Sequence, residues 1–189
     1  MIDIKIGNKT IQKAGIIYIS PDGNDNNSGT KESPVKTYEK AIQLCGNNYA
    51  IFFMKGTHTL NFFRYGGYNG NGDWAFFTNK YTSSSNTTYK KDIYLKNLLL
   101  FSNPIETKII CNNSYTMYYS NIYFIYINGS DDNLQLYNLN IEITINLNSA
   151  TSSYFYFLKG GSKDVSTINI TNCLIKCNIY NPYQSYSWG

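Results

Sequence analysis

The feature that most constrains this chain is a loose internal repeat of apolar residues around asparagine. In residues 134–141 apolar side chains alternate up to Asn138 and resume one position out of phase after it. Segments 93–100 and 168–175 show the same pattern when they are aligned on Asn97 and Asn172. Between the last two segments the match extends as far as residues 145 and 179, at a constant offset of 34 residues. Because periods of about 20 to 50 residues are the signature of stacked repeats, the chain is predicted to form a solenoid.

Each repeat predicts two strands with inward apolar alternation that meet at an asparagine corner. Asparagine tolerates left-handed backbone angles, and its amide can bond to the matching asparagine of the next coil about 4.8 Å away. A second type of strand, ending in glycine, is predicted at residues 51–56, 124–129 and 155–160. The alternative fold is a β-sandwich, which also uses short strands and regular turns but gives no reason for the phase slip at asparagine.

Composition supports a β fold and excludes two classes of partner. The chain has 19 tyrosines and only 15% charged residues, which suits strands and turns. The net charge is only +4 and Arg64 is the sole arginine, so bidentate recognition of phosphates or bases is poorly provided for. No segment approaches the roughly 18 apolar residues that span a bilayer. We expect neither a nucleic-acid partner nor insertion into a membrane.

Before the repeats, the sequence predicts a short extension and a helix. Residues 1–15 predict a small strand or hairpin, and residues 16–19 predict a buried strand that is followed by a dense cluster of turn residues. A helix is then predicted over about residues 34–45, with Ser33 as its N-cap, Pro34 as its first residue and Gly46 as its left-handed stop.

The segment IYISPDGNDNNSGTKESPVKTYEKAIQLC, followed by IFFMKGTHTL, resembles the entry segment of right-handed parallel β-helix proteins of the pectate-lyase-like superfamily. In that pattern a strand ending in S-P-x-G-x-D leads through G-T, a proline and an amphipathic helix to a strand ending in G-T-Y. The match covers residues 16–60, and the repeats continue it to Ile179. It implies an all-β, right-handed parallel β-helix over residues 16–189, in which the helix caps the open N-terminal end.

The family includes lyases, hydrolases, surface adhesins and phage tail spikes, so the fold alone does not give the function. Residues 1–13 also resemble short strand elements at the start of phage structural proteins, and the first residues lack the apolar region of a signal peptide. We therefore expect a virion appendage, with an extracellular or cell-surface protein as the alternative. Trimerisation is an expectation that rests on the resemblance to spikes.

An aromatic insertion, about residues 61–89, is the predicted binding segment, because long loops in solenoids commonly carry function. Aromatic faces stack on sugar C–H surfaces, while polar side chains bond to hydroxyls. The alternative is that these aromatics cover the flank of the solenoid or pack against another subunit. The candidate glycan-binding residues are Arg64, Tyr65, Tyr68, Asp73, Trp74 and Tyr81.

No metal, cofactor or catalytic site is predicted. Asp22, Asn24 and Asn26 have the spacing that begins a calcium loop, but the glycine and the closing glutamate of that loop are missing, so a hydrogen-bonded turn is preferred. His58 stands in place of the tyrosine of the G-T-Y pattern and is interpreted as structural. The cysteines are widely spaced among apolar residues and are interpreted as buried thiols: Cys45, Cys111, Cys173 and Cys177.

The acid and base groups of this fold's lyases and hydrolases are not visible in the sequence. Asp131, Asp132 and Asp164 follow glycine turns and are interpreted as solvated turn carboxylates. The predicted function is a non-enzymatic structural protein that contacts glycan or another subunit. The alternative is a polysaccharide-active lyase or glycoside hydrolase whose catalytic residues lie elsewhere.

Overall fold

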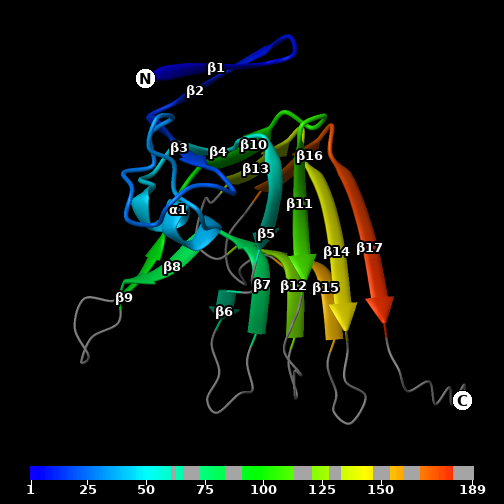
Figure 1. The fold of residues 1–189 in the computed structure, drawn as a ribbon. Helices are drawn as coiled ribbons and strands as arrows, with labels where there is room; N and C mark the ends of the chain where they lie inside the picture. Colours follow the sequence, from blue (N-terminus) through cyan, green and yellow to red (C-terminus); the bar gives the residue numbers. More distant parts are fainter. Residues whose placement is uncertain are drawn as a thin grey trace, which may run out of the picture.

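The computed structural model describes residues 1–60, 63–65, 73–83, 91–112, 121–127, 133–146, 154–159 and 167–180. Within these ranges, strands from successive stretches of the chain stack into three parallel sheets, with one helix at the N-terminal end (Figure 1). The predicted fold class, an all-β parallel β-helix with a capping helix, is confirmed. Among the described residues, no helix has the length and apolarity that crossing a membrane requires.

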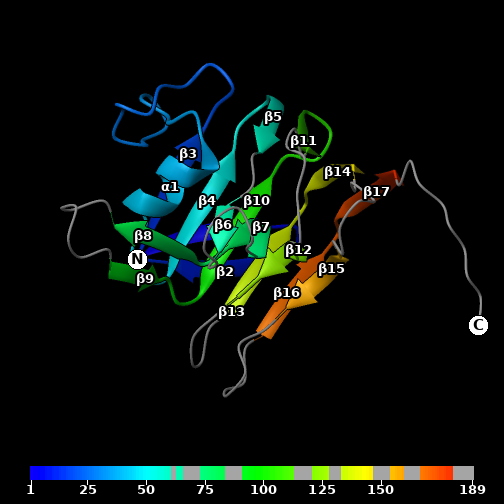
Figure 2. The same ribbon diagram turned by 90° about the horizontal axis from the view of Figure 1, so that it is seen from below.

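The first sheet has five parallel strands in the order β16-β13-β10-β4-β3, which lie side by side in the view from below (Figure 2). Alternate residues of these strands point inward, so that Ile51, Leu100 and Leu136 form a fully buried column. The strands are β3 (Gly15–Ile19), β4 (Tyr49–Phe53), β10 (Leu98–Ser102), β13 (Asn133–Tyr137) and β16 (Thr167–Thr171).

The second sheet follows the first around the solenoid in the order β17-β14-β11-β5, again with parallel pairing throughout. Its inward column includes Ile109, Ile141 and Ile175, of which the first two are fully buried. The strands are β5 (Gly56–Leu60), β11 (Thr107–Asn112), β14 (Asn140–Asn146) and β17 (Leu174–Tyr180).

The third sheet has the order β15-β12-β7-β6, in which β6 pairs antiparallel with β7 and the other pairs are parallel. A separate antiparallel hairpin, β8 (Lys80–Ser83) with β9 (Lys91–Tyr94), precedes the return to the first sheet. The strands of the third sheet are β6 (Phe63–Tyr65), β7 (Asp73–Thr78), β12 (Asn121–Tyr126) and β15 (Tyr154–Lys159).

The interior between the three sheets is one apolar core that runs along the solenoid. Each fully buried leucine or isoleucine contributes about 1.5 to 3 kcal/mol through removal of its side chain from water. A single coil cannot bury these side chains on both sides, so the stability of each coil depends on its neighbours.

Helix α1 (Tyr38–Leu44) covers the N-terminal end of this core. Its residues Tyr38, Ala41 and Ile42 are buried, and the Tyr38 hydroxyl donates to the Thr78 carbonyl at 2.9 Å. The Tyr38 ring lies 6.3 Å from that of Phe53, stacked on it. The helix therefore shields apolar side chains of the first coils, as the capping role requires.

The start and the end of the helix differ from the prediction. The N-cap is Thr37, whose Oγ1 accepts from Lys40 N at 3.1 Å, and not Ser33. Val35 stays extended because it donates to the Tyr18 carbonyl at 3.0 Å and accepts from Ser20 N at 2.9 Å, beside the edge of β3. The left-handed residue after the helix is Asn48, with φ 61°, in place of the expected Gly46.

The predicted N-terminal extension is an antiparallel hairpin of β1 (Ile2–Ile6) and β2 (Lys9–Lys13), which lies outside the first sheet (Figure 1). Its residue Ile4 is buried with Leu99 and Tyr137 on the outer face of that sheet. Lys13 is fully buried, and its Nζ donates to the Asn97 carbonyl at 2.7 Å and to Asn97 Oδ1 at 3.1 Å. The hairpin is thus attached to the solenoid by both apolar and polar contacts.

The predicted asparagine corners are confirmed. Asn97, Asn138 and Asn172 have left-handed φ angles of 52°, 55° and 52°. The Asn172 amide donates to Asn138 Oδ1 at 2.7 Å, and the Asn97 amide donates to Asn48 Oδ1 at 2.6 Å. Side-chain hydrogen bonds between asparagines of neighbouring coils are therefore present at both of these corners.

The offset of 34 residues is confirmed between the last two repeats, where Leu134 pairs with Ile168 and Ile141 pairs with Ile175. The alignment of the earlier repeat was wrong. Leu98 pairs with Leu134, so Asn97 precedes its first-sheet strand, whereas Asn138 follows one. Both corners combine a left-handed asparagine with a phase slip, so the motif does not distinguish them.

The grouping of the glycine-ended strands was also wrong. Strand β4, which contains Ile51–Phe53, belongs to the first sheet, while β12 and β15 belong to the third. The third-sheet neighbour of β12 in the preceding coil is β7. The predicted insertion therefore contributes a strand of the solenoid itself, because inward residues of β7 fill the same core.

Candidate functional site

Four of the six candidate glycan-binding residues lie on two neighbouring strands. In the antiparallel pair β6–β7, Arg64 is opposite Trp74 and Tyr65 is opposite Asp73. Since β7 also pairs with β12, this hairpin forms the N-terminal edge of the third sheet. The fold thus places residues from both ends of the intervening segment next to each other at one sheet edge.

The other two candidates are not brought to that edge by any described element. Tyr81 lies on β8, opposite Ile93 of β9 in the separate two-stranded sheet. Tyr68 lies outside the described residues. The assignment of all six residues to glycan binding stays a prediction.

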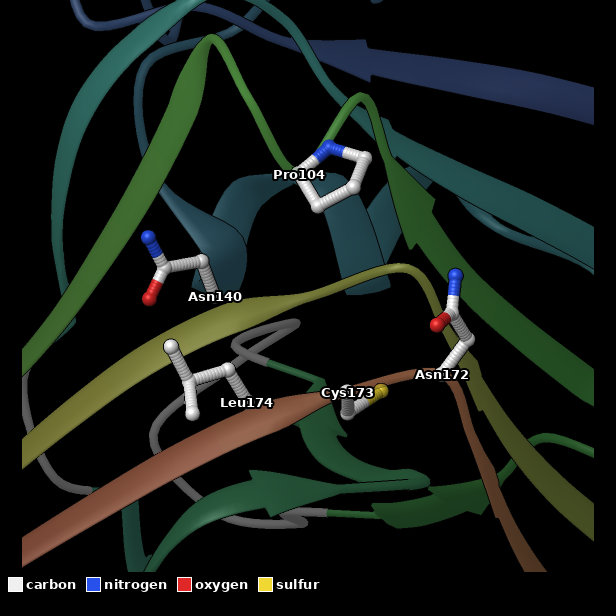
Figure 3. Close-up of a pocket in the computed structure, with 5 residues that line it drawn as sticks. All are labelled: Pro104, Asn140, Asn172, Cys173 and Leu174. Carbon is white, nitrogen blue, oxygen red and sulfur yellow. The ribbon is translucent and has the colours of Figure 1, made fainter.

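A second candidate site was missed by the sequence analysis. At the junction of the first and second sheets, five residues line an open hollow of about 290 Å³: Pro104, Asn140, Asn172, Cys173 and Leu174. Figure 3 shows the side chains of Asn140 and Leu174 projecting to the side on which Pro104 lies, with the Asn172 amide also directed that way.

The hollow arises because turns of unequal length are stacked at this junction. Residues 103–106 connect β10 to β11, whereas two residues suffice in the next coils, at 138–139 and 172–173. The longer turn therefore projects above the shorter corners (Figure 3). The signal for this site was the four-residue turn Asn103-Pro104-Ile105-Glu106, which the repeat alignment on asparagine obscured.

The projecting turn is held by its own hydrogen bonds. Asn103 Oδ1 accepts from Ile105 N at 3.3 Å, and Asn103 Nδ2 donates to Glu106 Oε2 at 2.8 Å. The Glu106 carbonyl accepts from Gly56 N of the preceding coil at 2.9 Å. This rigid turn leaves Ile105 93% exposed beside the hollow.

A row of aromatic residues on the outer face of the first sheet serves packing. The Phe52 ring lies 5.7 Å from Tyr18 and 4.9 Å from Phe101. The next residue of the row, Tyr137, is buried beneath the N-terminal hairpin, with Lys9 Nζ 5.9 Å from its ring. Phe101 and Tyr137, at one end of the row, therefore belong to the surface on which the hairpin rests.

The calcium-loop candidates form a hydrogen-bonded turn. Asn24 Oδ1 accepts from Asn26 N at 2.9 Å, and Asp22 N donates to Ser20 Oγ at 3.3 Å. Across the described ranges, no three histidine, cysteine or acidic side chains are grouped so as to hold a metal ion.

The carboxylate that organises this loop is Asp25, which the sequence analysis did not single out. It accepts from Lys36 N, Thr37 N and Thr37 Oγ1, each at 2.9 Å. Partial burial raises its pKa, but these hydrogen bonds outweigh burial, so the pKa of Asp25 lies below the usual value. Asp25 therefore ties the loop to the N-terminus of α1.

His58 is buried next to Phe53, whose ring meets it edge-on at 5.3 Å. Its Nε2 lies 2.7 Å from the Met54 carbonyl, which requires the proton on Nε2 and leaves the buried Nδ1 without a partner. Burial lowers the pKa of His58, and the bond to Met54 opposes this shift. These contacts are those of a neutral packing residue.

All four cysteines are free thiols. Cys45 and Cys111 are buried as expected, and burial raises the pKa of Cys45 to about 12. The expectation was wrong for Cys177, which is exposed. Cys177 occupies the inward position above the fully buried Ile143, but it lies on the last described coil.

These observations define the class of protein as a parallel β-helix. No protein-family model and no curated protein matches the chain. Among solved structures, the chain is similar to a rhamnogalacturonan lyase, with 18% identity and a TM-score of 0.47 over 92% of this chain and 43% of the other.

Two further solved structures are similar. The pectate lyase Pel9A has 14% identity and a TM-score of 0.37, over 72% of this chain and 34% of the other. The GH136 lacto-N-biosidase from Eubacterium ramulus has 11% identity and a TM-score of 0.38, over 86% and 34%. The chain spans less than half the length of each of the three structures. At these identities the likeness concerns the fold alone.

Proposed function

We propose that this chain is a non-enzymatic structural protein of a virion appendage or a cell surface, and that it contacts glycan through the hairpin β6–β7. The observation that carries the proposal is the register of this hairpin, in which Arg64 is opposite Trp74 and Tyr65 is opposite Asp73. Residues directly opposite in an antiparallel pair have their Cα atoms about 4.5 to 5.5 Å apart.

The residue types in these pairs suit a sugar. Tryptophan and tyrosine offer faces on which the C–H surface of a sugar ring stacks. Arginine donates and aspartate accepts hydrogen bonds, so each pair combines one aromatic residue with one partner for hydroxyl groups. The location at a sheet edge supports contact with a large partner, since the edge strand β6 has a neighbour on one side only in the described sheet.

The proposal extends to location and assembly. The resemblance of residues 1–13 to phage structural proteins supports a place on the virion, with the cell surface as the alternative. Other structural subunits, including two further copies of the chain in a trimer, are the second class of partner that such a protein would contact.

A glycan array, combined with a polysaccharide-depolymerisation assay, tests this function. We expect binding without turnover, and we expect Arg64→Ala and Trp74→Ala each to weaken it about tenfold or more, as loss of a central contact does. Lys36→Ala, an exposed position in the capping segment, is the matched control and should bind normally. Tyr68→Ala examines the candidate that lies outside the described residues.

Each other outcome contradicts part of the proposal. Turnover of any polysaccharide would establish an enzyme. Binding that survives both hairpin variants would move the contact elsewhere on the chain. If the chain shows no binding and no turnover, the remaining function is that of a purely structural subunit.

A further inference from the structure

We propose that the hollow at the asparagine corners is a second binding site, which takes one uncharged sugar residue. This site lies at the junction of the first and second sheets, whereas the hairpin β6–β7 lies on the edge of the third. The inference therefore goes beyond the contact proposed for the hairpin and stands on different residues.

The size of the hollow fits a single ring. Its volume is about 290 Å³. Since one water molecule takes up about 30 Å³ of liquid, the hollow holds roughly ten molecules of that size, which suits a ligand of about a dozen heavy atoms. Pockets for larger ligands extend up to about 1,000 Å³. One pyranose unit fits, and a longer chain has to continue outside.

The hollow presents hydrogen-bonding groups that the fold leaves available. In the part of the chain that the structure describes, the Asn140 amide makes no hydrogen bond, although the residue is half-buried. The Asn172 amide nitrogen donates to Asn138 Oδ1, while the Asn172 amide oxygen accepts no bond from a described residue. An amide offers both donors and acceptors, which is what the hydroxyl groups of a sugar require.

The opposite walls are apolar. Leu174 is 54% exposed at the base of the hollow, and Pro104 faces it from the projecting turn (Figure 3). Burial of such a surface is favourable, and the C–H face of a sugar ring is a ligand surface that matches it. The turn that carries Pro104 is fixed by the Asn103 hydrogen bonds, so little ordering is needed on binding.

The charges around the hollow favour an uncharged ligand. None of its lining residues is charged. Nearby, Lys55 pairs with Glu106 at 3.4 Å and Lys108 with Glu142 at 2.6 Å, while Lys176 lies beside Glu142 on the neighbouring strand. The bond from Lys108 also lowers the pKa of Glu142, which keeps this carboxylate ionised and paired. Among the described residues, no cation lines the hollow itself, so a uronate or a sulfated sugar would have no direct ion-pair partner there.

Cys173 supplies a reporter because it is one of the residues that line the hollow, and its half-buried thiol lies against the Leu136 and Thr171 carbonyls. In a Cys177→Ser background the exposed thiol is removed, while Cys45 and Cys111 are buried and protected. The rate of Cys173 alkylation by iodoacetamide is measured against methyl glycosides of glucose, galactose, mannose and N-acetylglucosamine, and against methyl glucuronide. Saturation-transfer NMR on the unmodified chain measures the same binding without chemistry at the thiol.

We expect at least one neutral glycoside to slow alkylation saturably, and Asn140→Ala to raise its Kd about two- to tenfold, as loss of a hydrogen bond does. Asn140→Ala should fold normally because the amide bonds to no described residue. The matched control is Asn178→Ala, an exposed asparagine of β17 outside the hollow.

Failure to protect Cys173, together with no NMR signal from any neutral glycoside, would overturn the site. Equal protection by methyl glucuronide, or a Kd unchanged in Asn140→Ala, would overturn it as well, and protection by short peptides alone would make it a peptide site. Protection that persists in Trp74→Ala, while array binding is lost, would separate this site from the hairpin contact.

Discussion

At the scale of single residues, asparagine does two tasks at the corners of this solenoid. A left-handed backbone costs most residues about 1 to 2 kcal/mol, and asparagine is among the few that adopt it readily. The same side chain bonds to the next coil, as Asn172 does to Asn138. In the first coil, Asn48 accepts the corresponding bond from the Asn97 amide, although it lies in the turn between the helix and β4 and outside the asparagine repeat.

Substitution at Asn138 separates these two contributions. Asn138→Leu should lower the free energy of unfolding by about 2 to 3 kcal/mol, through backbone strain and loss of the bond from Asn172. Asn138→Gly keeps the backbone angle without strain and should cost only about 1 kcal/mol, for the lost hydrogen bond from Asn172. Urea unfolding measures both, and equal costs for leucine and glycine would show that the left-handed angle has no energetic weight.

At the scale of elements, the N-terminal hairpin is joined to the solenoid by a buried amine. Lys13 Nζ has the Asn97 carbonyl and amide oxygens as partners and no carboxylate among the described contacts. Burial lowers the pKa of Lys13 from 10.5 to about 8. The attachment of β1–β2 is therefore sensitive to the protonation of one side chain.

The sign of this pH dependence follows from linkage. Between pH 8 and 10.5 the unfolded state binds more protons at Lys13 than the folded state. The contribution of Lys13 to the free energy of unfolding therefore grows as pH rises through this range, and it is lost as pH falls through 8. The unfolding free energy of Lys13→Met should lack this contribution. Denaturant midpoints of both proteins between pH 7.5 and 9.5 give the difference, in which tyrosine titration cancels. Parallel pH profiles would refute the burial of a charged amine here.

At the scale of the whole molecule, burial of the interior differs between the first and the last coils that the structure describes. Helix α1 closes the N-terminal end, whereas interior positions on the last described coil are open. Ile179 is 51% exposed and Phe157 is 42% exposed, while Ile145 and Phe124 in the coil before are fully buried. In a stack where each coil packs on its neighbours, this coil has a described neighbour on one side only.

Amide hydrogen exchange should reveal this gradient. We expect strands β16 and β17 to exchange at least about tenfold faster than β10 and β11, because opening the last described coil disrupts only one described interface. Peptide-resolved mass spectrometry measures the rates, with β4 as the reference for the capped end. Uniform protection from β4 to β17 would mean that the stack unfolds as one unit.

The sequence by itself determined the solenoid, the 34-residue offset of its last two repeats and its corners, since these depend on alternation, phase slips and turn residues within a few positions of each other. It also indicated a capping helix, although the bonds of Asp25 and the pairing of Val35 with β3 moved its start to Tyr38. Only the tertiary structure decided which coil each strand joins and where Asn97 stacks. Only the stacking of a four-residue turn over two-residue corners created the hollow, because strand register and the heights of neighbouring turns depend on pairing between residues far apart in the chain.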